Sequence, residues 1–101
     1  MKLKELFRNY KTKKHTISLF KESICDKKFL SLNETKDFVH DKLISDKMGC
    51  YMYLMTVLGD DFNRSKYIDK QNNWLKDENG DFVIYNDFIE IVSKVLYDNC
   101  Q

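Results

Sequence analysis

Apolar residues recur every three to four positions along most of the chain, which is the spacing of amphipathic α-helices. Residues 3–10 carry the first such stripe and predict a short helix. The polar run 11–15 then interrupts the pattern, and Thr16 can cap a second helix that carries Phe20 and Ile24. A third helix is expected after Ser31, because Ser31 and Glu34 have capping-box spacing and apolar positions follow within residues 38–44.

The segment 48–62 is the most apolar part of the chain and predicts a fourth helix. Its stripe consists of Met48, Tyr51, Met52, Met55 and Leu58. Phe62 continues this stripe if the helix passes through Gly59. We expect the stripe to form the central core, because apolar residues at this period usually pack inward. The alternative is an adaptable binding surface, since polarizable methionine side chains also line such surfaces.

The stretch WLKDENGDFVIYNDF, residues 74–88, predicts a turn followed by the last helix. Asn79-Gly80 between apolar flanks is typical of a type I′ turn, so residues 74–75 and 82–85 should form a short β-hairpin. An EF-hand loop anchored on Gly80 would place Leu75 first and Asn86 twelfth, and neither supplies the required carboxylate. A helix over residues 87–98 follows, with capping-box spacing between Asp87 and Glu90.

These elements predict one mainly α-helical domain of five to six helices with one short β-hairpin near residues 73–85. A chain of 101 residues is long enough for a single core. Residues 1–70 should form a helical bundle, and residues 71–101 should add the hairpin and the last helix to the same core. Asp60 and Asp61 can cap a further turn that holds Tyr67 and Ile68.

Charge is distributed unevenly, although the net charge is only +1. Residues 1–30 carry nine basic and three acidic side chains, giving +6, whereas residues 31–101 carry eight basic and thirteen acidic, giving −5. Such asymmetry can mark a contact with nucleic acid or an acidic protein, or a solvated helix face. We find no apolar run of membrane-span length and no leader-like segment, which predicts a cytoplasmic protein without membrane contact.

The order of short motifs resembles the YozE SAM-like family of small Firmicute and phage proteins. The resemblance covers residues 3–67 and rests on LFRNYKTKKHTISLFKESICDKKF, ETKDFVHDKL and YMYLMTVLGDDFNRSKY. Leu30 departs from the proline that this family usually has there, and residues 68–101 extend beyond its typical end. The resemblance implies a compact helical bundle similar to sterile alpha motif domains, and it implies no catalytic residue.

No catalytic, metal or cofactor constellation is expected. His15 and His40 lack any accompanying metal or nucleophile motif. The cysteines Cys25, Cys50 and Cys100 are odd in number and widely spaced, which favours reduced thiols. Cys25 beside two lysines could be a reactive thiol, although a buried structural cysteine is the simpler interpretation.

Two binding functions follow from these patterns. In the first, the chain is a non-catalytic protein-interaction module, in one version a phage or mobile-element inhibitor of a host nucleic-acid-processing protein. Its candidate contact residues are Asp60, Asp61, Trp74, Asp77, Glu78 and Asp81. In the alternative, the basic N-terminal third binds nucleic acid by releasing counterions from phosphates. The residues for that function are Lys11, Lys13, Lys14, Lys27 and Lys28.

Overall fold

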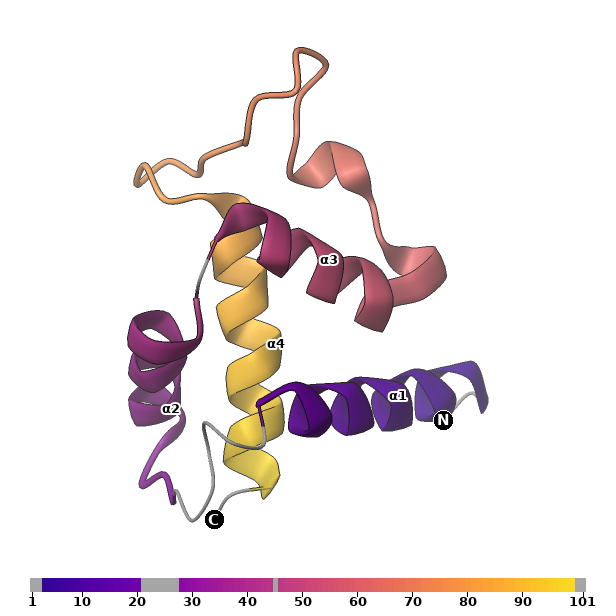
Figure 1. The fold of residues 1–101 in the computed structure, drawn as a ribbon, viewed down its shortest axis with the longest axis vertical. Helices are drawn as coiled ribbons and strands as arrows, with labels where there is room; N and C mark the ends of the chain where they lie inside the picture. Colours follow the sequence, from indigo (N-terminus) through magenta and orange to yellow (C-terminus); the bar gives the residue numbers. More distant parts are fainter. Residues whose placement is uncertain (1–2, 21–27, 45, 100–101) are drawn as a thin grey trace.

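The computed structural model describes residues 3–20, 28–44 and 46–99, and this part of the chain is mainly helical (Figure 1). It holds four α-helices: α1 (Leu3–Phe20), α2 (Leu32–Phe38), α3 (Lys47–Leu58) and α4 (Val83–Asn99). A π-helical turn, η1 (Val39–Leu43), follows α2, and two 3-10 turns, η2 (Gly59–Asp61) and η3 (Arg64–Lys66), follow α3. The mainly α class is confirmed, but the expected five to six helices are replaced by these four.

Helix α4 is the centre of the fold, and α1, α2 and α3 each contact it (Figure 1). Its buried residues include Ile84, Phe88, Val92 and Leu96, which repeat at helical spacing. The Phe88 ring lies edge-on to Tyr53 of α3, with ring centroids 5.2 Å apart, and to Phe20 of α1 at 6.1 Å. One aromatic side chain of α4 therefore joins two other helices.

The last helix is confirmed, but it begins at Val83 instead of residue 87. Ile84 precedes Phe88 by four positions, so it extends the same apolar stripe by one turn. Asp87 is consequently no cap. Its carboxylate accepts a hydrogen bond from the Tyr67 hydroxyl at 2.8 Å and pairs with the Lys66 ammonium at 2.7 Å.

The predicted β-hairpin is wrong. Residues 83–85 belong to α4, so the second arm is absent, and the segment before α4 has only isolated bridges, Ile68 to Trp74 and Lys76 to Phe82. A turn does form there, with Gly80 at φ +85° and its N–H donating to the Asp77 carbonyl at 3.1 Å, but it is not the predicted type I′ turn, because Asn79 does not share the positive φ. The strand preference of β-branched and aromatic residues depends on their surroundings, so such residues can instead join the apolar stripe of a helix.

The first two predicted helices are one continuous helix, α1. The run 11–15 contains no Gly or Pro, and lysine is a good helix former, so its polarity does not stop the helix. Thr16 is buried instead of capping, and its hydroxyl shares a hydrogen bond with that of Tyr53. Ile24, predicted on the second helix, lies outside the described residues.

The start of α2 follows the sequence prediction. The Ser31 hydroxyl accepts a hydrogen bond from the Glu34 N–H at 3.1 Å, so Ser31 is the predicted cap. The Glu34 carboxylate in turn accepts from the Leu30 N–H at 3.2 Å. The first bond satisfies a backbone donor that the first turn of a helix leaves open, whereas the second goes to the residue before the cap and so departs from the reciprocal bond of a capping box.

The segment after α3 differs from its prediction. Gly59 has φ +53°, which ends α3, so Phe62 does not continue its stripe. Asp60 and Asp61 lie within η2 and do not cap the next turn. Asn63 does so for η3, because its side chain accepts a hydrogen bond from the Ser65 N–H at 3.2 Å. Tyr67 and Ile68 then enter the core.

We expect Ser93→Ala to stabilise the protein. The Ser93 hydroxyl is buried on α4 and has no hydrogen-bond partner among the described residues. An unsatisfied buried polar group costs about 1–3 kcal/mol, and alanine adds about 0.5 kcal/mol of helix propensity. Urea denaturation should therefore show a gain of at least about 1 kcal/mol in the free energy of unfolding. Ser18→Ala, an exposed change on α1, should give only the propensity term; a loss of stability in Ser93→Ala contradicts this account.

Candidate interaction surface on α3

Helix α3 is apolar on nearly all sides, because Lys47 is its only charged residue. The face that packs inward consists of Cys50, Tyr53, Leu54 and Val57. Their spacing of three, four and seven positions forms one helical stripe. The Tyr53 ring stacks on His15 at 5.6 Å and lies 6.2 Å from Phe20, so this face is held by α1 as well as by α4.

The opposite face of α3 is exposed and carries three methionines. Met48, Met52 and Met55 are 56%, 49% and 39% exposed. The prediction that these methionines form the central core is therefore wrong. Helical spacing is satisfied on two faces of α3, and only the position of its neighbours decides which face is buried. The alternative interpretation, an adaptable surface lined by methionine, agrees with the exposed face.

Trp74 lies beside α3 and supports the chain that follows it. Its ring lies edge-on to Tyr51 of α3 at 6.0 Å, and Tyr51 also contacts Phe62 at 5.0 Å. Trp74 is half-buried, and its backbone forms the bridge to Ile68. This predicted contact residue therefore packs the 62–82 segment onto one side of α3.

The predicted acidic residues form two groups at opposite ends of α3. Asp60 and Asp61 are exposed in η2, directly after the last residue of the helix. Asp77, Glu78 and Asp81 lie in the turn before α4, which adjoins the start of α3 because Lys47 Nζ sits 4.6 Å above the Phe82 ring. The 12 residues of α3 span about 18 Å at about 1.5 Å each. The exposed methionines lie between these two groups.

Asp77 organises its own turn. One carboxylate oxygen accepts from the Asn79 N–H at 2.8 Å and the Asp81 N–H at 3.0 Å, and the other accepts from the Asn86 side chain at 2.7 Å. The backbone hydrogen bond from Asp81 is the main cause that lowers the pKa of Asp77 below its ordinary value. The side-chain hydrogen bond from Asn86 and the backbone hydrogen bond from Asn79 act in the same direction. Both oxygens therefore serve the turn.

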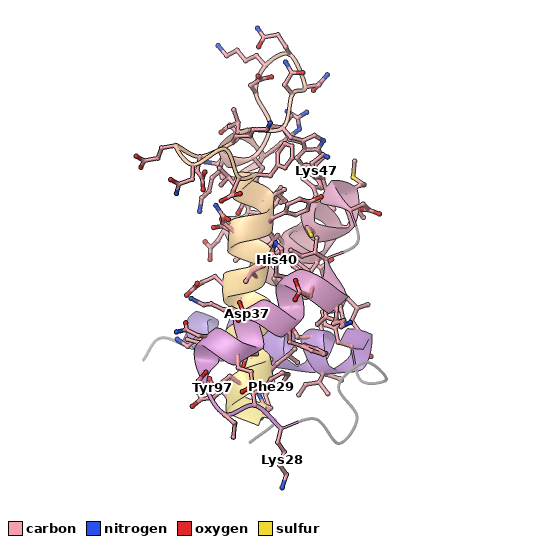
Figure 2. The ribbon with its side chains drawn as sticks, turned by 90° about the vertical axis from the view of Figure 1, so that its left-hand side faces the viewer. Lys28, Phe29, Asp37, His40, Lys47 and Tyr97 are labelled. Carbon is pink, nitrogen blue, oxygen red and sulfur yellow. The ribbon has the colours of Figure 1, made fainter. Side chains whose placement is uncertain are left out.

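The predicted basic residues do not form a uniform positive surface in the described structure. Lys13 and Lys14 are exposed on α1, and Lys28 extends away from the helices before α2 (Figure 2). Lys11 also lies on α1, whereas Lys27 lies outside the described residues.

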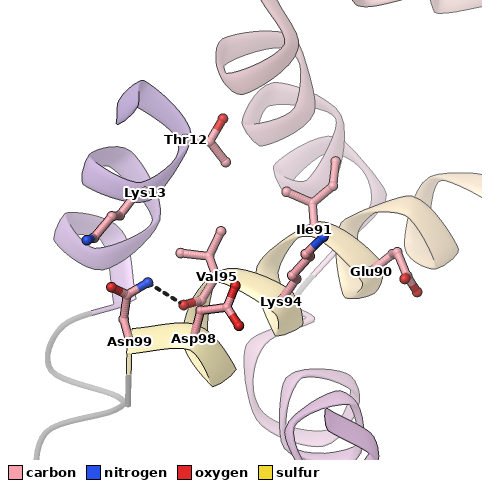
Figure 3. A pocket seen from close by; sticks show the side chains of 8 residues that line it. All are labelled: Thr12, Lys13, Glu90, Ile91, Lys94, Val95, Asp98 and Asn99. Atoms are coloured by element: carbon pink, nitrogen blue, oxygen red, sulfur yellow. Dashed lines mark hydrogen bonds between the residues drawn. The ribbon is translucent and has the colours of Figure 1, made fainter. Parts of the chain in front are cut away.

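Lys13 lines a groove of about 670 Å³ between α1 and α4 (Figure 3). The same groove is lined by Lys94, Glu90 and Asp98 of α4. The Asn99 side-chain amide donates a hydrogen bond to the Val95 carbonyl there at 2.7 Å. Two carboxylates beside two lysines weaken the attraction for phosphate, because they repel it at the same range. The groove therefore gives little support to nucleic-acid binding.

The remaining candidate residues that the structure describes, His40 and Cys50, have contacts that suit a structural role. His40 is exposed on η1 beside Asp41, at 3.0 Å (Figure 2). Cys50 is a free thiol, and burial, assisted by the nearby charge of Asp46, raises its pKa to about 12, which leaves it unreactive. Cys25 and Cys100 lie outside the described residues. Within residues 3–20, 28–44 and 46–99, no group of three or more His, Cys, Asp or Glu side chains could hold a metal ion.

No family model, curated protein or solved structure matches this chain. The resemblance to the YozE SAM-like family therefore stays a prediction. None of the helices in the described part of the chain has the length and apolar character needed to cross a membrane.

We expect Asp77→Ala to destabilise the protein in a pH-dependent way. A carboxylate whose pKa is lowered by folding contributes stability above its unfolded pKa, and this contribution is lost as the pH falls through the folded pKa. The difference in unfolding free energy between wild type and Asp77→Ala should stay constant above pH about 5 and shrink below about 4. Urea denaturation across this range measures it, and Glu78→Ala removes the same charge without those hydrogen bonds. A difference that does not change down to pH about 2 would show that Asp77 does not hold the turn as a carboxylate.

Proposed function

We propose that the chain is a non-catalytic protein-interaction domain that binds through the exposed methionine face of α3. We define this face by Met48, Met52 and Met55. The observation that carries the proposal is a helix without any charged residue from Met48 to Leu58 whose outer side is left to solvent. A helix that is apolar all round is normally buried, so its open side is suited to contact with another protein.

Methionine supports this function for a physical reason. Its unbranched side chain and polarizable sulfur adjust to differently shaped apolar partners. The acidic residues predicted as contacts lie at the two ends of this face, where they would form the rim of an interface. Rim charges mainly guide association and select partners, whereas the apolar centre supplies most of the affinity.

The rigid support behind the face also favours binding. Tyr53 on the inner side of α3 contacts three aromatic rings and the Thr16 hydroxyl, and Tyr51 anchors Trp74 on the flank. A helix held on two sides presents its third side with its backbone already ordered, so binding has to order only the methionine side chains. The hypothesis of a mobile-element inhibitor acting on a nucleic-acid enzyme stays a prediction from size and composition.

Affinity capture with mass spectrometry tests the proposal. We expect wild-type protein to retain a specific partner from a bacterial lysate and Met52→Glu to bind it at least about tenfold more weakly, because a carboxylate would be buried in an apolar contact. Met52→Leu should retain binding, since it conserves apolar volume.

Leu30→Glu is the matched control, because Leu30 is 90% exposed and lies before α2, away from α3. It introduces the same charge at an apolar position and should not alter capture. A partner that binds Met52→Glu as well as wild type, or one lost equally in Leu30→Glu, would show that the methionine face is not the binding surface.

A further inference from the structure

The methionine face has the spacing of a helix-pairing surface. Met48, Met52 and Met55 are followed by Gly59, so the four positions alternate at intervals of four, three and four residues. Helices that pack along one another use this alternation for their contact positions. Gly59 has no heavy atom within 4 Å of the place where a Cβ would stand, so a second helix can approach closely there. The face is therefore suited to a helix as its partner.

The start of α3 is acidic, although lysines lie there as well. Residues 41–47 and 76–81 come together at this end, because Lys47 and Lys76 lie over the same Phe82 ring, 4.6 Å and 5.0 Å from its centroid. The two segments carry five acidic and three basic side chains, which gives a net charge of −2. The acidic residues are Asp41, Asp46, Asp77, Glu78 and Asp81, and the basic residues are Lys42, Lys47 and Lys76.

The other end of α3 is acidic too. Asp60 and Asp61 follow the helix and are exposed, and Arg64 in η3 offsets one of their two charges. Lys66 and Asp87 pair at 2.7 Å and cancel each other. These residues together give this end a net charge of −1. Between the two ends, residues 48–59 carry no charge.

Helix α1, which carries Lys13 and Lys14, packs on the inner side of α3. His15 stacks on Tyr53 at 5.6 Å, and the Thr16 hydroxyl shares a hydrogen bond with that of Tyr53. The width of α3, about 10 Å, therefore separates α1 from the methionines. The outer side of α3 is thus an apolar surface with negative charge at both of its ends.

We infer that the methionine face binds an amphipathic helix of another protein whose apolar stripe has lysine or arginine residues at both ends. This inference rests on the proposed function, because it states the chemistry of the partner for the same surface. Complementary charge selects such a partner, and surfaces rich in methionine accept amphipathic helices. A second copy of α3 does not meet this requirement, because acidic ends would face acidic ends in either orientation.

Synthetic peptides test the charge pattern. Each peptide is a helix with about 12 central positions of leucine and alanine, the length of α3, and the two differ only in having lysines or glutamates at both ends. Fluorescence anisotropy should show that wild type binds the lysine-ended peptide with a Kd of about 10–100 µM and the glutamate-ended peptide at least about tenfold more weakly. Equal binding of the two peptides, or no binding of the lysine-ended peptide up to about 1 mM protein, overturns the inference.

Reversing the end charges tests the location of the contact. Asp60→Lys/Glu78→Lys changes one exposed carboxylate at each end of α3, so it should weaken the lysine-ended peptide at least about tenfold and strengthen the glutamate-ended peptide. Asp37→Lys/Asp98→Lys is the matched control, because it makes the same change in net charge at exposed positions on α2 and in the last turn of α4, away from α3 (Figure 1). If the control loses the lysine-ended peptide equally, net charge alone attracts it and the inference is overturned.

Met52→Gln tests the apolar centre without adding charge. It should weaken the lysine-ended peptide several-fold, because a polar amide would be buried in the contact, whereas Met52→Leu should bind as wild type does. Unchanged binding in Met52→Gln overturns the inference. Circular dichroism of each variant checks that the helices are intact.

The two proposals fail in different ways. If wild type binds both peptides equally while Met52→Glu still loses the captured protein, the basic partner is wrong and the interaction function stands. If the captured protein and the lysine-ended peptide are both insensitive to substitution of Met52, both proposals are wrong. Sedimentation equilibrium of the protein alone tests a second copy as the occupant: a wild-type dimer that Met52→Gln abolishes would overturn the inference.

Discussion

The contact between Phe88 of α4 and Tyr53 of α3 determines which side of α3 faces solvent. Phe20 of α1 touches both rings, and the hydroxyl of Thr16 meets that of Tyr53, so three helices converge on this one side chain. Burial raises the pKa of Tyr53 to about 12, so its hydroxyl stays protonated even at alkaline pH. With Tyr53 fixed inward, the geometry of a helix places the methionines outward.

How much of this fold the sequence predicts depends on how many faces of each helix are apolar. Helix α4 was predicted well because one broad stripe distinguishes its inner side, and only its first turn was missed. Helix α3 could not be predicted in the same way. Its residues satisfy helical spacing both at Cys50, Tyr53, Leu54 and Val57 and at the methionines. Choosing between two apolar faces requires the positions of α1 and α4.

Local sequence signals predicted the structure correctly where a single residue sets the backbone conformation. They were less reliable where the preferences of several residues compete. Ser31 caps α2 as predicted, and Gly80 takes the positive φ expected of it although the turn is not type I′, because a hydroxyl acceptor and a positive φ act locally. Polarity alone did not break α1, and strand propensity alone did not make a hairpin. The division of the candidate acidic residues between the two ends of α3 follows from tertiary structure, so the sequence alone does not predict it.

The position of the acidic residues at the two ends of α3 connects the fold with the proposed function. An uncharged, adaptable centre with charged residues at its ends is the usual anatomy of a protein interface. The 62–82 segment supplies one flank by packing Trp74 and Phe62 on Tyr51. Because this flank and the core hold α3 on separate sides, the methionine face is rigid in backbone and flexible in side chain.

The central claim is that α3 is oriented with its methionines toward solvent and Cys50 toward the core. Peroxide oxidation followed by mass spectrometry tests this orientation most directly. In dilute native protein, Met48, Met52 and Met55 should oxidise at rates close to those of the denatured chain, because exposed thioethers are accessible. Cys50 should stay unmodified under the same conditions, since it is buried with a raised pKa. Protected methionines together with an oxidised Cys50 would mean that α3 buries the opposite face, and would contradict the account.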